Sequence, residues 1–213
     1  MQISNDRYFD DRRRHDLALR MIRHEARTCT IRLCTGLTDD RIRRLYQTYA
    51  SHVPAAPTRR HRGKSPRQIA FYMRNAQMQF EASLLAALFV VFGLLDGSPQ
   101  TEHDRLRYGV LFCDAYETHA QLLPASPMSF EHAWFLLQLL MRQGAFDALR
   151  CRQCDGAFLQ DRTTVLRRAC PSCKLKDARS VRRRSGSRRR GSRDVHEEIR
   201  LPPPPAAADR LGA

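Results

Sequence analysis

Four cysteines in the C-terminal half are the residues whose type and spacing could do chemistry. They form two pairs, Cys151 with Cys154 and Cys170 with Cys173, and fifteen residues separate the pairs. This spacing predicts a site in which four thiolates bind one zinc ion. Zinc takes four thiolates at about 2.3 Å each in a tetrahedral shell, which leaves no position for a substrate. We therefore expect one structural ion, although four thiolates also suit iron.

The charge balance of the chain favours a polyanionic partner. Its 213 residues hold 37 Lys and Arg against 22 Asp and Glu, a net charge of +15. Ten of the basic residues lie within 174–193, but the remainder of the chain is also basic. Nucleic acid and anionic membrane surfaces are the partners that such a charge attracts.

The other cysteines and the apolar runs indicate a cytoplasmic protein without a membrane segment. Cys29, Cys34 and Cys113 are an odd number without a spacing pattern, and residues 1–14 do not resemble a signal peptide. In a reducing compartment, paired cysteines more often bind metal than form disulfides. The most apolar run, 82–95, is too short for a membrane core of about 30 Å. A buried helix is the better interpretation of that run.

The apolar spacing predicts a mainly α fold, with a multi-helix body over 10–144. Thr101 is expected to cap a helix, Gly93 and Gly144 to end helices, and Ser126-Pro127 to start one. The central helix is apolar nearly all round, so it should be the centre of a core or a subunit interface. The expected helices span residues 10–33, 38–50, 65–92, 101–121 and 126–143.

A helix-turn-helix within 17–50 is one interpretation of the first two helices, because a short turn containing Gly36 joins them. The second helix would then offer Arg41, Arg43 and Arg44 to DNA. An ordinary helical hairpin with a solvated basic face is the alternative interpretation.

Residues 145–178 should form a zinc-ribbon-like module, with short strands over 157–159 and 163–166. Residues 179–213 are rich in Arg, Ser and Pro, so we expect a disordered basic tail. Arginines around the cysteines and in the loop over 52–65 are candidates for DNA contacts. They are Arg150, Arg152, Arg162, Arg167 and Arg168, with Arg59, Arg60 and Arg62 in the loop.

The chain resembles the FlhC family, subunits of the bacterial flagellar master transcriptional activator. The matching pieces run in family order over about residues 15–185. They are LTDDRIRRLYQTY, the helix from SPRQIAFYMRN to LLAALFVVFG, and AWFLLQLLMRQGAFDALRCRQCDGAFL leading into CPSC. The resemblance implies that Cys151, Cys154, Cys170 and Cys173 bind zinc. It also implies a complex of two FlhC with four FlhD that wraps promoter DNA.

The expected function is therefore that of a DNA-binding transcriptional activator subunit that acts with FlhD to switch on flagellar genes. Double-stranded promoter DNA is the expected ligand, and RNA polymerase is a further candidate partner. An RNA- or ribosome-binding zinc-ribbon protein is the alternative, and a scaffold that only orders a DNA-binding partner is another. An enzyme is not expected, because the histidines are scattered without metal or triad spacing: His15, His24, His103, His119 and His132.

Overall fold

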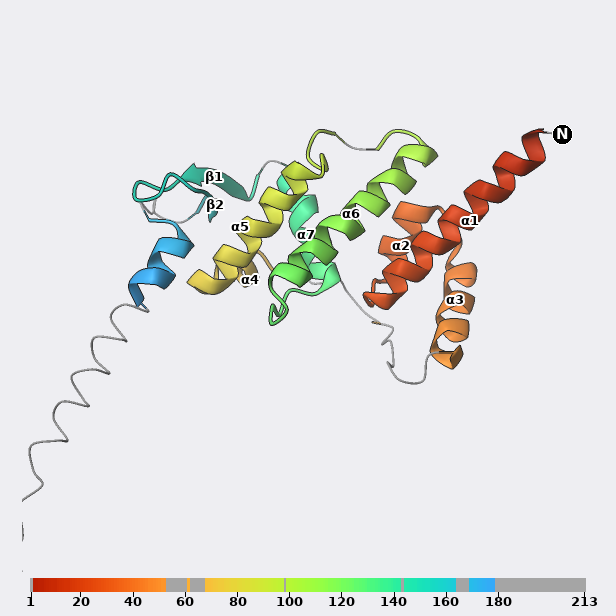
Figure 1. Ribbon diagram of the computed structural model, residues 1–213, viewed down its shortest axis with the longest axis horizontal. Coiled ribbons are helices and arrows are strands. Elements are labelled where there is room, and N and C mark those ends of the chain that lie inside the picture. The colour runs from red at the N-terminus through yellow and green to blue at the C-terminus, as the bar shows by residue number, and fades with distance from the viewer. Residues whose placement is uncertain are drawn as a thin grey trace, which may run out of the picture. The chain divides into compact units, whose positions relative to one another are not determined.

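The computed structural model describes residues 2–52, 61, 68–97, 99–142, 144–163 and 169–178. They are mostly helical, as predicted, and the four cysteines of the paired motif lie together near the C-terminal end of the described chain. The predicted tail over 179–213 lies outside the described residues. The elements, shown in Figure 1, are α1 (Gln2–Arg23), α2 (Thr28–Thr35), α3 (Asp39–His52), α4 (Ala70–Met73), α5 (Ala76–Val91), α6 (Glu102–Leu122), α7 (Phe130–Met141), β1 (Phe146–Arg150) and β2 (Ala157–Asp161), followed by a helix over 171–178.

The chain divides into two units after Leu175, and the labelled elements lie in the first, Met1–Leu175. None of the helices in the described part of the chain has the length and apolar character that crossing a membrane requires.

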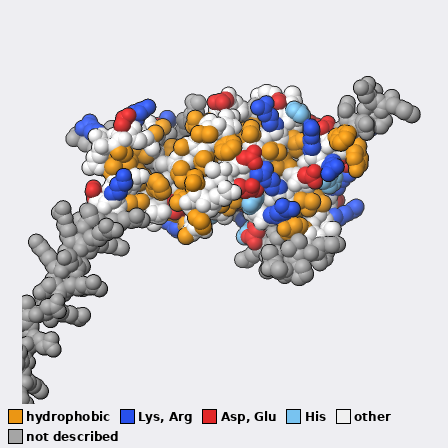
Figure 2. All heavy atoms as spheres, in the orientation of Figure 1, with side chains coloured by type: hydrophobic (Ala, Val, Ile, Leu, Met, Phe, Trp, Pro, Cys, Tyr) orange, Lys and Arg blue, Asp and Glu red, His pale blue; other side chains and the backbone are white. Residues whose placement is uncertain are grey.

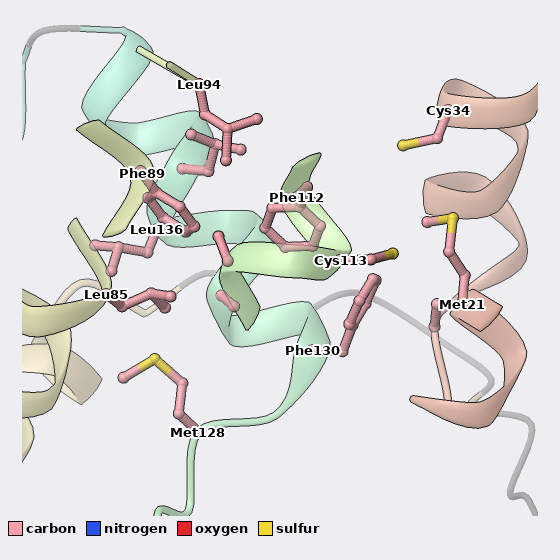
Figure 3. Packing of buried hydrophobic residues seen from close by; sticks show 14 of the residues in the cluster. Met21, Cys34, Leu85, Phe89, Leu94, Phe112, Cys113, Met128, Phe130 and Leu136 are labelled. Carbon is pink, nitrogen blue, oxygen red and sulfur yellow. The ribbon is translucent and has the colours of Figure 1, made fainter. Parts of the chain in front are cut away.

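Helix α6 is the element around which the core is built, since α1, α2 and α5 all pack against it (Figure 1). Phe112 and Cys113 are fully buried on α6, and Figure 3 shows Cys113 on the side of Met21 and Phe112 on the side of Phe89. The helices approach closely at Gly109, where an added Cβ would lie 2.8 Å from the Cβ of Cys34. The core therefore needs a glycine at this position of α6.

The prediction of one helix over 10–33 is wrong, because the chain breaks between α1 and α2. Glu25 adopts a left-handed conformation with φ 57°. The N–H of Ala26 donates to the carbonyl of Met21 and that of Glu25 to Ile22, the pattern of a Schellman cap. The freed N–H of Arg27 donates to the Glu131 carboxylate at 2.8 Å. A side chain from α7 thus satisfies a backbone group that a continuous helix would have bonded internally.

The predicted helix over 65–92 is also two helices, and its expected start lies outside the described residues. Asn75 is extended, and its side chain accepts a hydrogen bond from the N–H of Met78, which starts α5 there. The predicted start at Ser126 is wrong, because Ser129 caps α7 and Ser126 instead donates to Glu81 at 2.6 Å. In both places the helix starts at a residue whose side chain accepts a hydrogen bond from the backbone N–H three residues later.

Two predicted helix ends are confirmed. Thr101 caps α6 in a reciprocal capping box with Asp104, in which each side chain accepts from the other residue's N–H. Gly93 follows α5 with φ 67°, and the N–H of Leu94 donates to the carbonyl of Phe89. Both boundaries depend on residues within five positions of one another in the chain.

An ion-pair network ties α1 to α6. Arg20 donates to Glu117 at 2.7 and 2.8 Å and to Asp114 at 2.6 Å, and His24 lies 2.7 Å from Glu117. The hydrogen bonds from Arg20 lower the pKa of Glu117 from 4.5 to about 2, against the opposing effect of burial. The charged form of Glu117 is therefore favoured in the folded protein.

We expect Glu117→Gln to make the free energy of unfolding less dependent on pH in acid. A carboxyl whose pKa is lower in the folded state stabilises it above about pH 4.5, and this stabilisation is lost as the pH falls towards 2. Because the side chain is 32% exposed, the effect should be on the order of 1 kcal/mol. Thermal unfolding of both proteins between these pH values measures it. Glu102→Gln is the control, because Glu102 pairs with Arg14 but is 67% exposed. It should leave the pH dependence unchanged, and an equal response in both variants would contradict the prediction.

Candidate metal centre

A two-stranded hairpin carries the first cysteine pair and docks on α5. The strands β1 and β2 are antiparallel, with Ala148 opposite Leu159 and Leu149 opposite Phe158. Gln79 on α5 donates to the carbonyl of Leu159 at 2.8 Å, and the N–H of Leu159 donates to the hydroxyl of Ser83 at 3.0 Å. Side chains of α5 therefore satisfy the outer edge of β2, which an isolated hairpin would leave unpaired.

The four sulfur atoms of the paired cysteines lie within 4.8 Å of one another. The Sγ atoms of Cys151 and Cys173 are 3.9 Å apart, and those of Cys154 and Cys170 are 3.6 Å apart. Four sulfurs at about 2.3 Å from one tetrahedral ion would be about 3.8 Å from each other. Among the described residues, no other group of three or more cysteine, histidine or carboxylate side chains lies close enough to share an ion. The predicted ligand set can therefore hold a metal ion.

Backbone amides point at these sulfurs. The Sγ atom of Cys151 accepts from the N–H of Cys170 at 3.2 Å and of Gln153 at 3.4 Å. The first of these hydrogen bonds makes the largest contribution to lowering the pKa of Cys151 to about 6. The thiol of Cys173 shows the opposite effect, because hydrogen bonding to Cys170 and the neighbouring sulfurs raises its pKa to about 12. Four thiolates this close need a bound cation to be ionised together.

The sulfur cluster has a small apolar core of its own. Phe158 is 3% exposed and packs with Cys151, Cys170 and Cys173, with Leu149 partly buried beside them. The next residue of β2, Leu159, instead belongs to the large core of the helical body, as does Phe146 at the start of β1. Alternation along β2 thus turns one side chain towards the cysteines and the next towards the helices.

The strand prediction was partly right. The predicted strand over 157–159 lies within β2, whereas most of the one over 163–166 falls outside the described residues. The partner of β2 is β1, which precedes the first cysteine pair and was not predicted. Its sequence, Phe-Asp-Ala-Leu-Arg, does not alternate strictly between apolar and polar residues, so it carries no strand signal of the usual kind.

The structure brings three of the predicted arginines to the hairpin, all of them exposed. Arg150 pairs with Asp155 at 2.9 Å and Arg162 with Asp147 at 2.7 Å. Arg152 lies between the first two cysteines in the turn after β1. The other candidates lie outside the described residues: Arg167, Arg168, Arg59, Arg60 and Arg62.

A cavity of about 670 Å³ beside the break between α1 and α2 was not predicted. Several of its polar side chains pair with one another, as His61 does with Glu25 at 2.8 Å and Arg27 with Glu131 at 4.0 Å. Ser129 Oγ lies 2.6 Å from His132 Nδ1, but Ser129 is the N-cap of α7 and also accepts from the N–H of His132. Helix capping accounts for this contact, so the cysteine cluster is the better candidate site.

No protein-family model matches the chain, and no curated protein matches it either.

Proposed function

We propose that the chain is a DNA-binding subunit of a transcriptional activator of the FlhC kind, which acts with FlhD on flagellar promoters in the cytoplasm. The four gathered thiols carry this proposal. They follow the helical body, directly after α7 and β1. The resemblance to the FlhC family implies a metal-binding module at this place in the chain. The net charge of +15 supports a nucleic-acid ligand.

Zinc is the metal that we propose for this site. All seven cysteines are free, and four thiolates with no fifth donor suit a closed structural zinc site. The residues that would hold the ion are Cys151, Cys154, Cys170 and Cys173. The ion would fix the hairpin and its exposed arginines, Arg150, Arg152 and Arg162, in one arrangement, and it would not act on a substrate.

Competition binding tests the DNA assignment against an RNA- or ribosome-binding function. The metal-loaded full chain, alone and mixed with FlhD, is given labelled duplex from a flagellar promoter at one fixed salt concentration. Unlabelled promoter duplex should displace the label at lower concentration than structured RNA. Co-purification with FlhD and a footprint on the same duplex should accompany this preference.

Binding should weaken steeply with salt, because each neutralised phosphate releases counterions. Changing Arg150, Arg152 and Arg162 to alanine together should flatten the slope of log affinity against log salt by up to about three. Preferential displacement by RNA would contradict the DNA assignment. An unchanged salt slope in the triple variant would place the DNA contacts elsewhere on the chain.

A further inference from the structure

The helices α2 and α3 are joined by a three-residue turn, 36–38, that packing holds in one conformation. Gly36 ends α2 with φ 70°, a left-handed conformation that favours glycine, and its N–H donates to the carbonyl of Arg32 at 2.9 Å. Leu37 in the turn is 2% exposed, and Ile31 on α2 and Ile42 on α3 are fully buried. The turn is therefore fixed by packing on both of its sides.

A third helix supports this pair. Both α2 and α3 pack against α1, and the hydroxyl of Tyr46 on α3 donates to the carbonyl of Ala26 in the break between α1 and α2. The break that the sequence did not predict is thus what shortens α2 to eight residues and anchors α3. A short helix, a turn containing glycine and a second helix held by a third form the framework of helix-turn-helix DNA-binding units.

The outer face of α3 carries side chains that suit base recognition. Ile42 and Tyr46 face the core, so helical periodicity places Arg44 and Gln47 on the opposite side, and both are exposed. Neither side chain forms a hydrogen bond or ion pair within the described part of the chain. The neighbouring arginines are engaged, Arg43 with Asp40 at 2.8 Å and Arg41 with Asp11 at 3.4 Å.

The surroundings of α3 suit a duplex. Residues 7–49 hold eleven arginines against six acidic residues, and Figure 2 shows basic side chains gathered over the end of the molecule formed by α1–α3. Figure 1 places α3 at that end of the helical array. An α-helix about 10–12 Å across fits the major groove, which is about 12 Å wide. There arginine can form two hydrogen bonds to guanine, and glutamine can form two to adenine.

On the basis of the DNA-binding function proposed above, we propose that α3 lies in the major groove and reads bases through Arg44 and Gln47. Arg41 and Arg43, on the flanks of the same face, exchange their exposed ion pairs with Asp11 and Asp40 for phosphate contacts. The metal-binding hairpin then adds affinity but does not select the sequence.

Selection from a pool of duplexes with randomised sequence tests this assignment. The full chain, alone and mixed with FlhD, is compared with Arg44→Ala and with Gln47→Ala. The wild type should enrich a motif. Arg44→Ala should lose about tenfold discrimination at a G·C pair and Gln47→Ala a similar amount at an A·T pair. Both positions are exposed, so circular dichroism, metal content and co-purification with FlhD should not change.

The matched controls are Arg107→Ala and Gln121→Ala, which remove exposed side chains of the same types from α6. They should select the wild-type motif with the wild-type preference. If the α3 variants also do so, α3 does not read bases, although the proposed DNA binding stands. If the wild type enriches no duplex in either arm, both proposals fail. If the α3 variants lose FlhD but keep the preference, α3 is a protein-binding face.

Discussion

Replacing Cys170 with serine should abolish metal binding and loosen the hairpin while the helical body stays folded. Cys170 contributes one of the four sulfurs, its N–H donates to Cys151, and its own Sγ accepts from the N–H of Cys173. Binding of a structural metal stabilises small modules by about 10 kcal/mol or more, so an incomplete ligand set should not retain the ion. The body should survive because its core holds residues from all seven labelled helices and does not include Cys170.

Two measurements check this result. Elemental analysis should fall from about one metal ion per chain to near zero. Hydrogen exchange should become fast in β1 and β2 but stay slow in α6. Cys29→Ser is the matched control, because Cys29 is exposed and lies outside the sulfur cluster. A Cys170→Ser protein that retains stoichiometric metal, or that keeps slow exchange in β2 without metal, would refute the coupling of metal binding to folding.

The second large effect is expected at Phe112. Its replacement by alanine should lower the free energy of unfolding by about 4 kcal/mol. Phe112 is fully buried. Its ring centroid lies 4.9 Å from that of Trp134, 5.0 Å from that of Phe130 and 5.9 Å from that of Phe89. Removing the ring leaves a cavity at the contact of α5, α6 and α7 (Figure 3).

Urea unfolding followed by circular dichroism measures the difference. Val91→Ala is the control, since Val91 is 78% exposed on α5 and should change stability by less than about 0.5 kcal/mol. A loss below about 1 kcal/mol for Phe112→Ala would mean that the three surrounding rings can close the space, and it would contradict the packing described for this core.

Features governed by near neighbours in the chain could be predicted from the sequence. The cysteine spacing gave all four members of the cluster because the two residues inside each pair hold both sulfurs on one turn. The capping box of Thr101 and the left-handed Gly93 were predicted for the same reason. The two caps depend on residues within five positions of one another, and the two cysteine pairs, fifteen residues apart, were joined by the spacing that zinc sites share.

The break at Glu25 could not be predicted, because a distant group stabilises it. Glutamate is not a typical residue for a left-handed conformation, and the Glu25 break is stabilised by Glu131, whose carboxylate accepts from an N–H 104 positions earlier in the chain. The break at Asn75 has a local cap, because its side chain accepts from the N–H of Met78, but the apolar pattern continues across it and indicated a single helix. The strand β1 was missed because its burial pattern depends on pairing with β2 and on contact with the helical core.

The neighbouring residues Phe158 and Leu159 have a consequence for any attempt to assign activities by shortening the chain. Because the sulfur cluster and the helical core meet within one strand, a truncation at residue 144 would do more than delete a metal site. It would uncover Tyr72, whose ring lies 6.0 Å from that of Phe146, and it would leave the Gln79 side chain without its acceptor. If such a fragment failed to show the proposed DNA binding, the cause could be damage to α5 as readily as loss of the cysteines. Point substitutions at the sulfurs separate the two effects better than a truncation, because they keep Phe146 and Leu159 in the chain even where the hairpin loosens.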